Sequence, residues 1–111
     1  MTDIDGLLRM MCDHGSSDLH LKAGSPPAIR LNGRLIVLKD LPPLSTEETE
    51  VLALSMMAER QKESFDTSHE ADFAYSLKGV GRFRVNVFYQ RGSIGITLRR
   101  VATQAVSADR R

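Results

Sequence analysis

The chain has 111 residues, of which 41% are hydrophobic and 26% are charged, and its formal net charge is +1. These values are typical of one globular domain with a buried core, and the small net charge argues against a surface for nucleic acid or anionic lipid. The single cysteine, Cys12, excludes an internal disulfide. No apolar run predicts a membrane-spanning helix or a signal peptide, so we expect a cytoplasmic protein without direct membrane insertion.

The chain opens with a predicted helix and continues into strands. Four apolar residues near the start have the i, i+3, i+4, i+7 spacing of one helical face, and Gly15 can close that helix. Residues 18–22 alternate polar and apolar side chains, as a half-buried strand does. Two short apolar runs then flank Asn32-Gly33, which tolerates the positive φ angles of a type I′ turn and predicts a hairpin. The residues on the helical face are Ile4, Leu7, Leu8 and Met11.

The middle of the chain predicts two helices and another strand. Ser45 and Glu48 have the spacing of a capping box, in which each side chain bonds the backbone of the other residue at a helix start. A second helical stretch covers roughly residues 58–65, and residues 72–77 alternate like a strand. The apolar residues of the first of these helices are Val51, Leu52 and Leu54.

The last hairpin can be predicted residue by residue. Apolar residues alternate along the strands 82–90 and 93–101, and a one-residue change of register would turn one apolar set away from the core. A two-residue turn at Arg91-Gly92 lets both sets face the same core. The turn implies five pairs across the strands: Tyr89 with Ile94, Val87 with Ile96, Val85 with Leu98, Asn86 with Thr97, and Arg84 with Arg99.

Arg84 and Arg99 are thereby placed directly opposite each other on the polar face. Such a like-charge pair is destabilising by up to about 1 kcal/mol. Solvent can screen the pair, a nearby acid such as Asp18 or Asp72 can neutralise it, or a phosphate can bind both guanidinium groups. Spacing alone leaves these alternatives open.

The sequence lacks the usual signatures of catalysis. A P-loop ends in Gly-Lys-Ser/Thr, and none of the four lysines is followed by serine or threonine, so we expect no ATP hydrolysis by this chain alone. The three histidines and the cysteine have no metal-ligand spacing, so we expect no metal site. No catalytic residue is assigned.

Two motifs carry a family resemblance that covers about residues 3–101. Residues 16–33 read SSDLHLKAGSPPAIRLNG and residues 81–91 read GRFRVNVFYQR. Together they resemble the N-terminal domain of PilT-like ATPases, within the type II and type IV secretion ATPase family. The resemblance implies an α+β, PAS-like fold: an antiparallel sheet of about six strands with two or three helices mainly on one face. Residues 1–101 would form this domain, and residues 102–111 a tail or linker towards an ATPase domain that this chain lacks.

The resemblance also implies roles for individual residues. In this family, nucleotide lies between the ATPase domain and the N-terminal domain, whose arginines approach the phosphates. Arg84 and Arg99 match those arginines, with Arg82 and Arg91 as weaker candidates. Asp18 and His20 would orient arginines or contact a neighbouring subunit, or else would simply be exposed strand residues at the helix-to-strand turn.

The expected function is that of an accessory domain of a hexameric motor for pilus retraction and twitching motility. Its partners would be the RecA-like ATPase domain, neighbouring subunits of the homo-hexamer and the pilus base machinery at the inner face of a bacterial cell membrane. ATP and Mg²⁺ would belong to the full-length parent. The alternative is a free-standing PAS-like sensor or interaction module that uses no nucleotide. A reading frame that continues past Arg111 into a P-loop domain would favour the motor.

Overall fold

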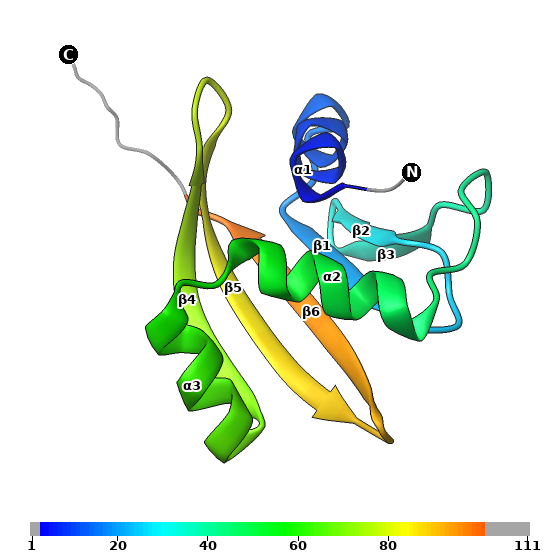
Figure 1. The fold of residues 1–111 in the computed structure, drawn as a ribbon. Coiled ribbons are helices and arrows are strands. Elements are labelled where there is room, and N and C mark those ends of the chain that lie inside the picture. Colours follow the sequence, from blue (N-terminus) through cyan, green and yellow to red (C-terminus); the bar gives the residue numbers. More distant parts are fainter. Residues whose placement is uncertain (1–2, 102–111) are drawn as a thin grey trace, which may run out of the picture.

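A computed structural model describes residues 3–101, which form one six-stranded antiparallel sheet and three helices (Figure 1). The expected α+β fold class is therefore confirmed, and the predicted tail at 102–111 lies outside the described residues. The strand order is β3-β2-β1-β6-β5-β4. The elements in chain order are α1 Ile4–Asp13, β1 Asp18–Lys22, β2 Ala28–Leu31, β3 Arg34–Val37, α2 Thr46–Met56, α3 Glu59–Ser68, β4 Glu70–Leu77, β5 Gly81–Gln90 and β6 Ser93–Arg100.

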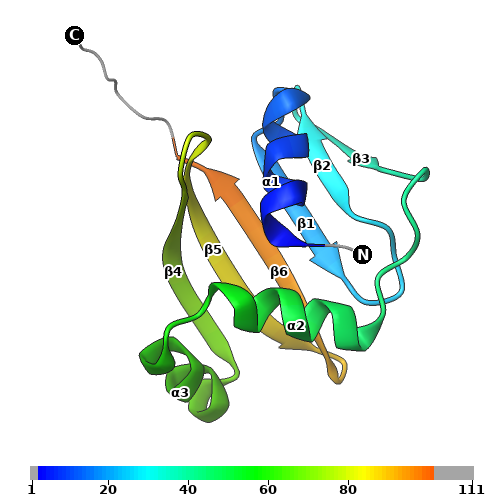
Figure 2. The same ribbon diagram turned by 45° about the horizontal axis from the view of Figure 1, so that its top comes forward.

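The helices α1 and α2 cover one face of the sheet, while α3 lies beside the edge strand β4 (Figures 1 and 2). We call the covered side the inner face and the opposite side the outer face. Apolar strand residues alternate towards the inner face because successive side chains of a strand point to opposite sides. Eleven of them are buried there with the helices: Leu19, Leu21, Ile29, Ala71, Phe73, Phe83, Val85, Val87, Ile94, Ile96 and Leu98.

Two tight turns fix the register of the sheet. Asn32 and Gly33 have φ angles of 53° and 81°, and Arg91 and Gly92 have φ angles of 54° and 82°. Both pairs have the positive φ values of two-residue type I′ turns, whose twist matches that of the flanking strands. All five pairs predicted for the β5–β6 hairpin are confirmed.

The helix ends also follow the local sequence. Gly15, with a φ of 72°, follows α1, and the N–H groups of Gly15 and Ser16 donate to the carbonyls of Cys12 and Met11. This is a Schellman motif, which glycine adopts without strain. The capping box at Ser45 is present, with both reciprocal hydrogen bonds between Ser45 and Glu48.

Some apolar side chains remain exposed on the described residues. The buried face of α2 is formed by Thr49, Leu52, Ala53 and Met56, so Val51 and Leu54 face outward. On β3, the edge strand on the other side of the sheet from β4, Leu35, Ile36 and Val37 are 51%, 41% and 43% exposed. Unlike the other strands, β3 therefore contributes little to the core.

Candidate functional site

The outer face collects the charged residues that the sequence singled out. The strand register aligns two neighbouring rows of side chains across the sheet. Arg84 and Arg99 belong to one row and line a hollow of about 340 Å³ that is open to solvent. The arginine row is Arg30, Asp18, Arg99, Arg84 and Ala74, and the adjacent row is Ala28, His20, Thr97, Asn86 and Asp72.

Arg99 is held by a buried carboxylate. Its Nε donates to Oδ2 of Asp18 at 3.2 Å, and the Ser17 hydroxyl donates to Oδ1 at 2.6 Å. The Asp18 side chain is 5% exposed, whereas that of Arg99 is 72% exposed. Asp18 is therefore not an exposed strand residue. It anchors the inner end of a guanidinium group that extends towards solvent.

Arg84 is held by a carboxylate at the surface. Its Nη2 lies 3.2 Å and 3.3 Å from the two carboxylate oxygens of Asp72. Both side chains are more than half exposed, at 63% for Arg84 and 56% for Asp72. An exposed ion pair of this kind contributes at most about 1 kcal/mol. Both acids considered from the sequence are thus used, one for each arginine.

The surroundings of Asp18 and His20 shift their pKa values. Burial alone raises the pKa of Asp18, but the hydrogen bonds from Ser17 and Arg99 and the nearby positive charges outweigh it, so this pKa lies below its usual value. Burial also lowers the pKa of His20, with Arg30 and Arg99 acting in the same direction against Asp18. These shifts favour the ionised form of Asp18 and the neutral form of His20.

His20 lines a second hollow on the outer face. The second hollow has a volume of about 270 Å³, and its mostly apolar lining includes Ala28, Val37 and Phe88. Nε2 of His20 is buried and has no hydrogen-bond partner among residues 3–101. Thr97 borders both hollows, so they are neighbours on the sheet.

The weaker arginine candidates occupy different places. Arg82 is exposed on β5, two residues before Arg84 and hence on the same face. Arg91 is exposed in the turn at the far end of the hairpin, seven residues from Arg84. Since a strand advances about 3.3 Å per residue, Arg91 is about 23 Å away along β5. The structure thus groups Arg82 with Arg84 and Arg99 and leaves Arg91 apart.

Two residues of the site were not singled out from the sequence. The Ser17 hydroxyl donates a hydrogen bond to the Asp18 carboxylate. The sequence signal for this contact was the adjacent Ser-Asp pair in the first motif. Arg30 stands opposite Asp18 on β2, on the other side of β1 from Arg99, and its Nη1 donates to the Gly33 carbonyl at 3.2 Å. The register of the Asn32-Gly33 hairpin implied that Arg30 and Leu35 share a face, but not that Asp18 joins them.

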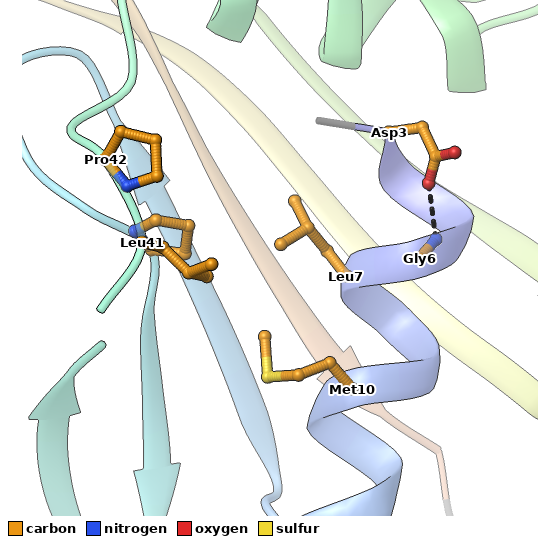
Figure 3. A pocket seen from close by; sticks show the side chains of 7 residues that line it. Asp3, Gly6, Leu7, Met10, Leu41 and Pro42 are labelled. Atoms are coloured by element: carbon orange, nitrogen blue, oxygen red, sulfur yellow. Dashed lines mark hydrogen bonds between the residues drawn. The ribbon is translucent and has the colours of Figure 1, made fainter. Parts of the chain in front are cut away.

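A third hollow, of about 240 Å³, lies on the helix side of the molecule (Figure 3). Leu7 and Met10 point from α1 towards Leu41 and Pro42 of the connector between β3 and α2. Its one charged lining residue, Asp3, accepts the Gly6 N–H at 2.6 Å as the helix cap. The lining is otherwise apolar or uncharged.

No group of three or more His, Cys, Asp or Glu side chains within residues 3–101 is arranged to hold a metal ion. No helix in that range is both long and apolar enough to cross a membrane.

Known proteins match this chain in sequence. The type IV pilus ATPase PilU of Pseudomonas aeruginosa is 45% identical over 101 residues, which are 91% of this chain and 26% of PilU. The PilT retraction ATPase of the same organism is 36% identical over 107 residues, which are 96% of this chain and 31% of PilT. The chain is a homologue of the PilT and PilU pilus ATPases. No protein-family model matches it.

Solved structures extend the match to the fold. A crystal structure of the pilus retraction motor PilT with bound ADP superposes with a TM-score of 0.88 and 41% identity, over 94% of this chain and 30% of that one. The ATPase DotB of Legionella pneumophila gives a TM-score of 0.73 at 25% identity, over 89% of this chain and 28% of DotB. The sheet and helices match the N-terminal domain of PilT. The chain spans under a third of the length of these relatives.

Proposed function

We propose that this chain is the N-terminal domain of a hexameric pilus retraction ATPase and that it helps to complete the nucleotide site. Arg84 and Arg99, with Arg82 beside them, would face the phosphates held by a RecA-like ATPase domain of the parent protein. The observation that carries the proposal is the pair of arginines directly opposite each other over an open hollow. Guanidinium groups bind phosphate oxygens through two parallel hydrogen bonds, and the relatives are named as pilus ATPases.

The chemistry of this surface suits phosphate better than metal. The arginine row supplies N–H donors and positive charge, whereas residues 3–101 contain no cluster of metal ligands. Any Mg²⁺ that accompanies ATP would be held by the ATPase domain. The arginines would stabilise negative charge on the phosphates during phosphoryl transfer, without forming a covalent bond. Neighbouring subunits and the pilus base, on the cytoplasmic side of the inner membrane, would be the partners.

ATP turnover by the hexamer made from the complete reading frame tests this proposal. Arg84→Ala and Arg99→Ala should each lower turnover by about tenfold or more, because a charge that stabilises the transition state is lost. Arginines in comparable roles contribute about 10³–10⁵ in rate, and we expect less here because the ATPase domain supplies further cations. Arg60→Ala, at an exposed arginine of α3, is the matched control.

Hexamers carrying either site substitution must remain assembled for the comparison to be valid, which size-exclusion chromatography reports. Assembled variants that turn over ATP as fast as the Arg60→Ala control would contradict the proposal. They would instead favour a domain that acts only through protein contacts.

A further inference from the structure

The two arginines of the hollow are held at different ends of their guanidinium groups. Asp18 binds Arg99 through Nε, the nitrogen nearest the backbone. Asp72 binds Arg84 through Nη2, one of the two terminal nitrogens. The two terminal nitrogens of an arginine can together bind a phosphate through two parallel hydrogen bonds. The two carboxylates therefore act on different parts of the surface that a phosphate would use.

Arg99 keeps its terminal nitrogens available. Within residues 3–101, Nη1 and Nη2 of Arg99 have no hydrogen-bond partner, and the side chain is largely exposed. Its inner end is fixed by a carboxylate that is 5% exposed and is itself bound by Ser17. Fixing Nε limits rotation of the guanidinium plane, so less conformational entropy is lost when an anion binds.

In Arg84, by contrast, a terminal nitrogen already has a hydrogen-bond partner. The Asp72 carboxylate takes one terminal nitrogen and adds a negative charge to the lining of the hollow. Because both partners are exposed, this pair is weak and can be broken by a stronger ligand.

We propose that Asp18 is a positioning residue that presents the terminal nitrogens of Arg99 to phosphate, and that Asp72 competes with phosphate for Arg84. This inference rests on the proposed function, in which the hollow faces the phosphates of a nucleotide. The two acids then have opposite effects: Asp18 strengthens phosphate binding and Asp72 weakens it. Charge alone predicts otherwise, since removing either negative charge would strengthen the binding of an anion.

The opposite effects of the two acids on anion binding can be measured on the 111-residue chain. Inorganic pyrophosphate is the probe, titrated at low salt and followed by NMR. Asp18→Asn should weaken pyrophosphate binding by about threefold to tenfold, because a neutral amide holds Nε less firmly than a carboxylate does. Asp72→Asn should strengthen binding by about twofold to fivefold. Asp66→Asn, at an exposed position of α3, removes the same charge away from the hollow and should have no effect.

Three outcomes would overturn the inference. Tighter binding by both Asp18→Asn and Asp72→Asn would show that only charge matters. If the unaltered chain does not bind pyrophosphate saturably, the positioning role of Asp18 is contradicted. The proposed function is then still tested separately, by ATP turnover of the hexamer. Unchanged binding by Arg99→Ala would count against the proposed function itself.

A measurement on the unaltered chain covers the case in which Asp18→Asn fails to fold. The Nε–H proton of Arg99 should exchange with water more slowly than that of Arg84, both before and after pyrophosphate is added, because its carboxylate partner is buried. Equal exchange rates for the two arginines would overturn the positioning role. Arg99→Lys adds a further check, since a lysine has one charged nitrogen and lacks the planar fork that lets Nε bind Asp18 while two terminal nitrogens face the anion, and this variant should bind pyrophosphate nearly as weakly as Arg99→Ala.

Discussion

At the outer face, burial separates side chains that look alike in the sequence. Arg84 and Arg99 are equivalent in a register diagram, and removing either would be expected to relieve their repulsion. The structure distinguishes them. Arg84→Ala breaks only a surface pair, whereas Arg99→Ala leaves the buried Asp18 with Ser17 alone. Loss of a hydrogen bond to a buried charge costs about 1.5–3 kcal/mol, so only the second change should be destabilising.

His20 should make stability depend on pH. Its pKa is lowered in the folded chain, mainly by burial, so the unfolded chain takes up the proton first as pH falls below the usual histidine value of 6.5. Stability should therefore be full above that value and decline below it until the folded pKa is passed. Thermal melts between about pH 7.5 and about pH 5, where carboxylates stay ionised, check this. His20→Gln should flatten the decline, and His14→Gln, an exposed histidine beside α1, is the control. Equal slopes for the parent and His20→Gln would contradict the assignment.

The site residues were only partly predictable from sequence. The opposition of Arg84 and Arg99 followed from alternation and a two-residue turn, which are local. The choice between Asp18 and Asp72 stayed open because it depends on which strands flank the hairpin. Asp18 is separated from Arg99 by 81 residues and meets it only because β1 pairs with β6. Nothing in the local pattern specified that pairing.

At the scale of elements, predictions succeeded where one short segment decides the structure. The capping box of α2 and both type I′ turns depend on a few neighbouring residues. Which residues of α2 are buried does not depend on neighbouring residues alone. Val51, Leu52 and Leu54 are all apolar, yet only Leu52 is buried, because the sheet contacts a face that also includes Thr49 and Ala53. Which helical face is buried is set by tertiary packing.

The assignment of the inner face can be tested at Val87, whose side chain is fully buried. Val87→Asp places an unpaired carboxylate in the core and should lower the free energy of unfolding by about 3 kcal/mol or more. The control is Ala74→Asp, at an exposed outer-face position of β4 opposite Arg84, which should change it by no more than about 1 kcal/mol. Urea denaturation measures both. Similar losses for the two variants would show that the faces are wrongly assigned.

For the whole molecule, the strand order determines what the domain can do. The first strand in the sequence and the last one lie side by side at the centre of the sheet, with β5 next to them. The central position of β1 brings the first motif, with Ser17 and Asp18, against Arg99 of β6, and Arg99 in turn lies opposite Arg84 of the second motif on β5. The two strings that resemble PilT-like ATPases are therefore parts of one surface, which sequence comparison could not show.

The exposed edge strand has a practical consequence for work with the isolated chain. β3 leaves one side of its backbone unpaired and carries three consecutive exposed apolar residues, a combination that favours edge-to-edge association. Concentrated samples should therefore self-associate and lose solubility. Ile36→Lys should raise the soluble concentration, as measured by light scattering, while Val51→Lys on α2 should do less because a helix has no free edge. A larger gain from Val51→Lys would assign the association to the helix instead. An edge charge of this kind would also let the anion titrations be done on a monomer.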